Sequence, residues 1–305
     1  MRFSFSLPHL LELPAVIQPW ELDVDGAGLA RAAKRADELG FAMLNVPEHL
    51  VIPDAHVELS GAFYFHATAA QGFLAGATER IRIGSCITLL PLHHPIALAK
   101  ALSTIDWMSG GRAVACFGVG WLEEEFDMLG VPFHERGRLA DEYLEAILTL
   151  WTEESASFEG KYVSFRDAAF APKPVQSPHI PIWFGGDADP ALRRLARFGS
   201  GWMPFLTPPE QLPQRIDYIC SQPTWQGGTL EVHYSLAALA IGEGHVPTGD
   251  DRARVGADKE QIIDALGHLA SLGVTATNAP IPPTRSLDEH LDLAQWFMEE
   301  VAPHV

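Results

Sequence analysis

Residues 81–119 read IRIGSCITLLPLHHPIALAKALSTIDWMSGGRAVACFGV, and this stretch decides the fold class. Two apolar runs within it, Ile81–Leu89 and Arg112–Val119, read as strands. Between them, the residues from Pro95 to about Met108 read as a helix that a Ser-Gly-Gly sequence ends. A strand, a helix and a second strand in this order favour a parallel sheet that is covered by helices.

The same alternation continues in both directions and gives eight βα units. Their strands are expected at Arg2–Leu7, Phe41–Val46, Ile81–Leu89, Arg112–Val119, Ile180–Phe184 and Val274–Asn278, with two weaker units between Gly201 and Leu272. Eight units predict an α/β fold, the (β/α)8 TIM barrel with inserted loops. The alternative is an open doubly wound sheet. That fold would carry a G-x-G-x-x-G turn after the first strand, and no such glycines follow it here.

Capping residues mark several helix starts. Asp25 is expected to cap a helix whose buried positions follow helical spacing, at Leu29, Ala32, Ala33 and Ala36. Asp189 is a second expected N-cap, with Pro190 at the first helical position. Ser286–Glu289 (SLDE) predicts a capping box for the last helix.

The chain reads as one domain over residues 1–305, with no repeat or linker. Three segments interrupt the βα rhythm, at about 51–65, 155–178 and 241–257, and are interpreted as insertions. Phe158–Phe165 within the second of them predicts a small hairpin. These loops are expected to contact the substrate, but they hold no motif that identifies it.

Composition excludes several classes of protein. The formal net charge is −18, from 21 Lys and Arg against 39 Asp and Glu, and an acidic surface repels nucleic acid and anionic membranes. Three cysteines without CxxC spacing indicate a reducing compartment. The chain start does not resemble a signal peptide, and no apolar run is long enough to span a membrane. A cytoplasmic protein is expected.

In a parallel barrel, functional residues lie on the loops that follow the strands. The second strand leads into Glu48 and His49, and a carboxylate beside an imidazole suits proton transfer. The alternative is that Glu48 caps a loop and His49 is a polar residue of the rim. No metal-binding spacing and no nucleophile elbow occurs in the chain, so no metal site is expected.

The third strand ends in small residues, Ser85, Cys86, Ile87 and Thr88, which would let a flat ring approach the backbone. A tightly packed barrel core is the competing interpretation. Cys86 is expected to be a buried structural cysteine rather than a reactive thiol.

The fourth and fifth strands lead into glycine-containing loops. Gly118 and Gly120 permit an unusual backbone path, Trp121 could stack on an aromatic ligand or anchor the loop, and Glu123 could face the cavity. The segment Gly185, Gly186, Asp187 and Ala188 runs directly into a helix, whose free N–H groups predict a phosphate site. The carboxylates of Asp187 and Asp189 would oppose a phosphate unless they point away.

Taken together, these segments resemble the luciferase-like monooxygenase superfamily, in particular its coenzyme F420-dependent oxidoreductase branch. The resemblance rests on five stretches in register: Arg31–Gly40 with Asn45–His49, Ile81–Pro95, Gly110–Phe126, Arg136–Trp151 and Ile180–Pro204. It implies a bacterial-luciferase-like barrel and a flavin-type coenzyme. Beyond about Thr207 the chain carries little of the pattern.

The resemblance also implies roles for residues. Glu48 and His49 would lie against a deazaflavin, although the usual acid at that position is Asp. A non-proline cis peptide is implied at Cys86–Ile87, behind the ring. Glu123 resembles a carboxylate near the reacting carbon of sugar-oxidising relatives. The amides of 185–188 resemble the site for the coenzyme phosphate, and His49 would exchange a proton during hydride transfer.

Coenzyme F420 is therefore the expected cofactor, and FMN is the alternative. Several FMN-dependent members have a Tyr where this chain has Gly137, which favours the deazaflavin. A two-component, reduced-FMN-dependent monooxygenase remains the second reading, and a flavin-binding protein without turnover is the third. The expected partners are a small-molecule substrate, a flavin or F420 reductase, and a second copy of the chain in a homodimer.

Overall fold

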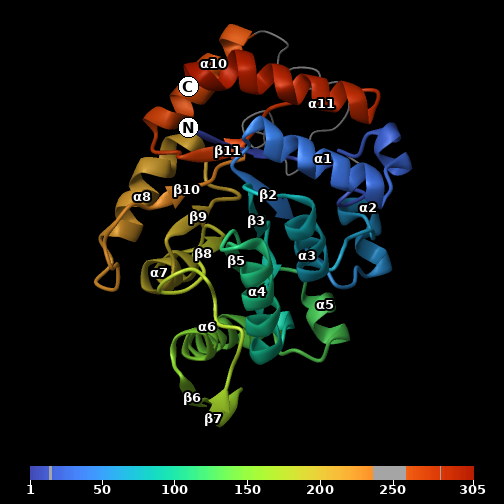
Figure 1. The fold of residues 1–305 in the computed structure, drawn as a ribbon. Coiled ribbons are helices and arrows are strands. Elements are labelled where there is room, and N and C mark those ends of the chain that lie inside the picture. The colour runs from blue at the N-terminus through green and yellow to red at the C-terminus, as the bar shows by residue number, and fades with distance from the viewer. Residues whose placement is uncertain (14–15, 236–258, 282) are drawn as a thin grey trace.

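Parallel strands form the centre of the molecule, and helices surround them (Figure 1). A computed structural model describes residues 1–13, 16–235, 259–281 and 283–305. The central strands are β1 (Arg2–Phe5), β2 (Met43–Val46), β3 (Arg82–Ser85), β4 (Thr88–Leu89), β5 (Ala115–Gly118), β8 (Ile182–Gly185), β9 (Gly201–Met203), β10 (Glu231–Val232) and β11 (Ala276–Asn278). The alternation of strands and helices confirms the predicted α/β class.

The central strands form two sheets that meet on both sides. One sheet has the order β11-β1-β2-β3 and the other has the order β10-β9-β8-β5-β4. Parallel bridges between Ile83 and Ala113 and between His233 and Ala276 connect the two sheets at their edges. Among the described residues, these contacts complete a ring of parallel strands, as a barrel requires.

The outer helices return the chain from one strand to the next, and they are α1 (Gly26–Leu39), α3 (Ala67–Ala77), α4 (Pro95–Ser109), α6 (Arg136–Thr152), α7 (Asp189–Phe198), α8 (Leu212–Cys220), α10 (Lys259–Ser271) and α11 (Leu287–Trp296). Two shorter helices, α2 (Val57–Ser60) and α5 (Glu123–Met128), lie in the loops after β2 and β5. Within the described ranges, no helix is both long enough and apolar enough to cross a membrane.

Helix α1 forms as its sequence predicts. The Asp25 carboxylate accepts a hydrogen bond from Gly28 N at 2.9 Å, and Gly40 ends the helix with a φ of 84°. Such a φ favours glycine, because a Cβ would crowd the backbone. The positions predicted to face the core are all buried, namely Leu29, Ala32, Ala33 and Ala36.

Three local predictions need correction. The third strand is not continuous, because β3 ends at Ser85 and β4 begins at Thr88. Helix α7 begins one residue early, so Ala188 is its N-cap and Asp189 bonds Arg215 instead of capping. Ser286 caps α11 as expected, but the Glu289 carboxylate accepts from Arg285 N rather than from Ser286 N.

The insertions differ in structure. Residues 155–178 contain the predicted hairpin, formed by β6 (Ser155–Glu159) and β7 (Ser164–Ala169), which projects from the body next to α6 (Figure 1). The Glu142 carboxylate on α6 accepts hydrogen bonds from three backbone N–H groups of its turn, those of residues 161–163. The insertion at 51–65 contains a 3-10 helix (Asp54–His56) and α2. The one expected at 241–257 lies outside the described residues.

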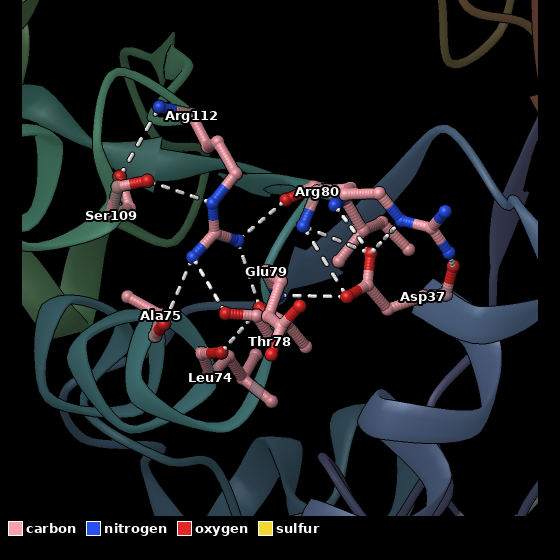
Figure 2. A network of polar contacts seen from close by, with 9 residues as sticks. Asp37, Leu74, Ala75, Thr78, Glu79, Arg80, Ser109 and Arg112 are labelled. Carbon is pink, nitrogen blue, oxygen red and sulfur yellow. Dashed lines mark hydrogen bonds and ion pairs between the residues drawn. The ribbon is translucent and has the colours of Figure 1, made fainter.

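A polar network fixes the end of the barrel where the strands begin (Figure 2). The Asp37 carboxylate, at the end of α1, accepts from the backbone N–H groups of Glu79, Arg80 and Ile81, with the shortest distances at 2.7 Å. A buried carboxylate needs such donors, because an unpaired charge away from water is costly. Asp37 therefore positions the entry of β3.

Arg112 supports the same end from the other side (Figure 2). Its guanidinium donates to the backbone oxygens of Ala75, Thr78, Ile81 and Ser109 at 2.8–2.9 Å. The five donors of an arginine suit this arrangement of carbonyl groups. The ends of α3 and α4 are thereby joined to the start of β3.

His233, directly after β10, is a buried polar group inside the ring. Its Nε2 lies 2.9 Å from Oγ of Ser4 in β1, so the pair links β1 to the end of β10 across the bridge between His233 and Ala276 of β11. Burial lowers the pKa of His233 to about 4.

Acid is predicted to destabilise the protein through this residue. In the unfolded chain His233 titrates near its ordinary value of 6.5, whereas in the fold it stays neutral down to about pH 4. Its stabilising contribution is therefore complete above pH 6.5 and decreases as the pH falls to 4, by about 3 kcal/mol. Urea unfolding between pH 4 and 7 should show a smaller loss in His233→Gln than in the wild type. An equal pH dependence of the two proteins would contradict this account.

Candidate functional site

The loops at the carboxyl ends of the strands bring most of the predicted site residues to one end of the barrel. At its centre the third strand passes from one sheet to the other. β3 pairs with β2, whereas β4 pairs with β5. The peptide bond between these segments, Cys86–Ile87, is cis, as the resemblance implied.

The Ile87 side chain occupies space that two glycines leave open. A Cβ on Gly118 would lie 2.0 Å from Ile87 Cδ1, and a Cβ on Gly185 would lie 2.6 Å from the same atom. Real side-chain atoms do not approach so closely, so both positions require glycine while Ile87 keeps this place. Gly118 and Gly185 thus shape the floor of the site.

Ser85 and Thr88 hold the two strand segments together. Ser85 Oγ donates to Cys116 O at 2.9 Å and accepts from Thr88 N at 3.0 Å and from Thr88 Oγ1 at 2.8 Å. Both residues are buried. Their hydroxyl groups are therefore engaged with protein partners, and their role in the structure is to fix the backbone beside Ile87.

Cys86 is exposed at this end of the barrel, so the expectation of a buried cysteine is wrong. The surrounding protein nevertheless raises the pKa of its thiol to about 11. The high pKa leaves little thiolate at neutral pH, so a reactive nucleophile is not indicated.

His49 is oriented by a buried carboxylate that the sequence analysis did not single out. Its Nδ1 lies 2.8 Å from Glu125 Oε2, and the Glu125 side chain is completely buried. Glu125 Oε1 accepts from Leu50 N at 2.7 Å and from Val51 N at 3.3 Å. With the Nδ1 proton directed to the carboxylate, Nε2 is the acceptor nitrogen, and no described residue hydrogen-bonds it.

Two aromatic rings pack against the His49 ring. The centroid of Tyr64 lies 5.0 Å from that of His49, and the centroid of Trp121 lies 6.1 Å away, both edge to face. Tyr64 comes from the insertion at 51–65, and its hydroxyl donates to Ser60 O at 2.6 Å. Burial raises the pKa of Tyr64, and the nearby charge of Glu125 raises it further.

Glu48 does not pair with its neighbour His49. Its Oε2 accepts from Leu89 N at 2.7 Å and lies 2.9 Å from His93 Nε2, so the carboxylate joins the loop after β2 to β4. Oε1 is buried and has no partner in the described part of the chain. Glu48 and His49 are thus both at the site, but each has its own partner.

Among the described residues, no hydrogen bond or ion pair joins Glu123 to His49. The Glu123 side chain is 50% exposed and its nearest ionic partner is His134 Nε2, at 3.4 Å. Glu125, two residues later on α5, occupies the buried position. The sequence did contain a signal for this, because Leu122, Glu125 and Phe126 follow the helical spacing of a buried face, and all three are buried.

The loop after β5 carries the other two residues predicted there. Gly120 has a φ of 82°, and a Cβ on it would meet Phe126 Cε2 at 2.6 Å. Trp121 is 53% exposed, and besides His49 it contacts the ring of His56 at 6.0 Å. Trp121 thus lies between two imidazoles and retains an accessible surface for a ligand.

The loop after β8 directs its carboxylates away from its own backbone amides. The Asp187 carboxylate accepts from the backbone N–H groups of residues 205–207, the closest being Leu206 N at 2.9 Å. Asp189 Oδ1 accepts from Arg215 Nη1 at 2.9 Å. Gly186 has a φ of 112°. Among the described residues, no partner occupies the N–H groups of Asp187 and Ala188, so these can receive an anion at the start of α7.

Known proteins resemble this chain in sequence. It matches the family described as luciferase-like monooxygenase over residues 13–222. An uncharacterised protein of Mycobacterium tuberculosis is 32% identical over 286 residues, which cover 90% of this chain and 92% of that protein. The FMNH(2)-dependent dimethylsulfone monooxygenase of Pseudomonas putida is 29% identical over 248 residues, which cover 79% of this chain and 66% of that enzyme.

Solved structures share the fold. The monooxygenase RslO1 from Streptomyces bottropensis superimposes with a TM-score of 0.80 at 23% identity and covers 100% of this chain and 99% of its own. The coenzyme F420-dependent tetrahydromethanopterin reductase of Methanopyrus kandleri gives 0.72 at 19% identity and covers 99% of both chains. At these identities the likeness shows the fold alone.

Adding one methyl group at the floor of the site is predicted to destabilise the protein. Gly118→Ala places a Cβ against Ile87 Cδ1, and overpacking of this kind costs about 1–3 kcal/mol. Gly72→Ala on α3 is the control, since nothing lies within 4 Å of its added Cβ. Urea unfolding should show a lower free energy of unfolding for Gly118→Ala only. Equal stabilities of both variants would show that Ile87 does not need this space.

The charge of Glu125 near Tyr64 predicts that neutralising Glu125 changes the pKa of Tyr64. Glu125→Gln removes a negative charge that raises the pKa of Tyr64, so this pKa should fall toward its ordinary value of 10.0. NMR of protein with labelled tyrosine can follow the titration without any coenzyme. Glu123→Gln is the matched control and should leave Tyr64 unchanged. The reverse order of effects would place Glu123, not Glu125, beside His49 and Tyr64.

Proposed function

Since the chain belongs to the luciferase-like monooxygenase family, we propose that it is an oxidoreductase that uses coenzyme F420 for hydride transfer to or from a small organic substrate. The observation that carries the proposal is the oriented imidazole beside the floor of the site. His49 follows β2 and presents an Nε2 without a described partner, Cys86 is exposed where the neighbouring strand β3 ends, and Glu125 fixes the His49 ring.

The residues present fit a planar coenzyme with a phosphate group. Cys86 has a small side chain and is exposed, so a flat ring can approach the backbone there. The N–H groups of Asp187 and Ala188 suit the phosphate, because the start of α7 adds the positive end of its dipole. Both nearby carboxylates are bonded elsewhere and leave these amides open.

When bound, a deazaflavin supplies a carbon that accepts or donates a hydride. The chain's own contribution is to move and position a proton. His49 Nε2 would take the proton from a substrate that is being oxidised or donate it to a substrate that is being reduced, because an imidazole can act as a base or an acid near neutral pH. Glu125 keeps Nδ1 protonated and stabilises the imidazolium that forms, while Tyr64 and Trp121 hold the ring in place.

Two observations support F420 over FMN. The family pattern of the F420-dependent branch includes an acid followed by His after the second strand, and Glu48 and His49 both lie at the site. Gly137 stands where several FMN-dependent members have Tyr. Its carbonyl accepts from Arg194 Nη2 at 2.9 Å, and a Cβ there would lie 3.5 Å from the same atom.

A reduced-FMN-dependent monooxygenase is the second candidate. It is favoured by the identity of 29% to the dimethylsulfone monooxygenase, whose name states FMNH(2) dependence. The same residues would serve this chemistry, with His49 as the proton donor or acceptor and the amides of 187–188 as the phosphate site.

Parallel titrations with F420, oxidised FMN and reduced FMN under anaerobic conditions, followed by fluorescence, separate the candidates. Selective binding of F420 with a Kd in the micromolar range is expected. Selective binding of reduced FMN would support the monooxygenase hypothesis instead. Binding of neither F420 nor FMN would contradict the proposal. In the active holoenzyme, His49→Ala should reduce kcat about 100-fold or more and alter the pH profile, whereas coenzyme affinity should change little.

A further inference from the structure

Six of the loops at the mouth of the barrel contain no Lys or Arg. The chain has 21 Lys and Arg residues. None of them lies in the segments that follow β1, β2, β3, β5, β8 and β9, which are residues 6–25, 47–66, 86–94, 119–135, 186–188 and 204–211. The loop after β11 adds Arg285, and the sequence after β10, most of which lies outside the described residues, adds Arg252 and Arg254.

Two arginines that border these loops, Arg136 and Arg215, already have partners. Arg136, at the start of α6, donates to Gly120 O at 3.2 Å and to Phe133 O at 2.9 Å, and its guanidinium stacks on the Phe133 ring. Arg215 donates to the Asp189 carboxylate and to the Asp187 carbonyl. Both guanidinium groups therefore stabilise the loops themselves.

Carboxylates lie beside the proposed reaction centre instead. The side chains of Glu48 and Glu125 are both fully buried, and each contacts an imidazole at the mouth, His93 and His49 respectively. Charges that are screened from water by protein act over longer distances than exposed ones. A negatively charged substrate group that approached His49 would be repelled by both of these carboxylates.

Exposed apolar side chains complete the rim. Val51 is 37% exposed, Trp121 is 53% exposed and Leu206 is 59% exposed, and they come from the loops after β2, β5 and β9. The backbone N–H of Val51 is bonded to Glu125, and the Trp121 ring contacts His49. At least two of the three thus lie next to the imidazole that would handle the proton.

We propose that the substrate is a mainly apolar molecule that carries no negative charge, with a single neutral polar group that hydrogen-bonds His49 Nε2. This inference rests on the proposed function, because it places the substrate beside His49. The coenzyme phosphate does not conflict with it, since the amides of 187–188 serve that anion on the β8 side. Trp121 supplies apolar contact area close to the reacting end.

A matched pair of probes tests the charge preference. 2-Naphthalenemethanol and 2-naphthoate share their ring system and differ in the charge of the polar group. Ligand-detected NMR on the protein saturated with its coenzyme should give a Kd for the alcohol that is about tenfold or more below that of the carboxylate. Added salt should narrow the difference, because it screens repulsion between charges.

Two tryptophan variants test whether the probe binds next to His49. Trp121→Ala should weaken binding of the alcohol at least about fivefold, since it removes contact area next to His49. Trp107→Ala is the matched control. Trp107 is 63% exposed but lies near the end of α4, on the opposite side of the barrel from the mouth, and its removal should leave the Kd unchanged.

The carboxylate binding as tightly as the alcohol would overturn the inference, and so would equal effects of the two tryptophan variants. Failure of the proposed function gives a different result, namely the absence of F420 and FMN binding. In that case the same probes are measured on the coenzyme-free protein, where preference for the alcohol and dependence on Trp121 are still expected.

Discussion

The packing of Ile87 against two positions without side chains is the constraint on which the site depends. Ile87 belongs to the segment where the third strand leaves one sheet and joins the other, and its side chain fills the space next to Gly118 and Gly185. Ser85 Oγ fixes the same segment, because it donates to Cys116 O on β5 and accepts from Thr88 N on β4. The floor is therefore determined by close contacts between three strands, and Cys86 is presented to solvent at its surface.

Buried carboxylates connect this floor to the loops above it. Glu48 joins the loop after β2 to β4, and Glu125 joins the same loop to α5. Each carboxylate satisfies backbone N–H groups and one imidazole, so the polar groups stabilise one another in a place that water reaches poorly. His49 owes its orientation to this arrangement. The polar network around Asp37 and Arg112 stabilises the opposite end of the barrel, where the strands begin (Figure 2). The candidate site lies at the other end.

Sequence reasoning succeeded where local patterns determine structure. Helix α4 begins at the expected Pro95, and α1 has the expected cap and buried face, because both follow from spacing and capping. It failed where tertiary contacts choose between neighbours. The partner of His49 was not foreseen, because only the structure shows that the start of α5 turns Glu125 inward and leaves the Glu123 side chain half exposed. From the sequence alone, the Asp187 carboxylate was expected to repel a phosphate. In the structure this carboxylate accepts hydrogen bonds from the loop after β9.

We propose that one mouth, formed by Cys86 and Ile87, His49 and the amides of 187–188, holds a flavin-type coenzyme. The decisive measurement is a crystal structure of the protein with bound F420. We expect the deazaflavin ring on Ile87, its phosphate at the start of α7, and His49 Nε2 facing the open side of the ring. A coenzyme bound away from Ile87, or with its phosphate outside the loop after β8, would disprove the proposal.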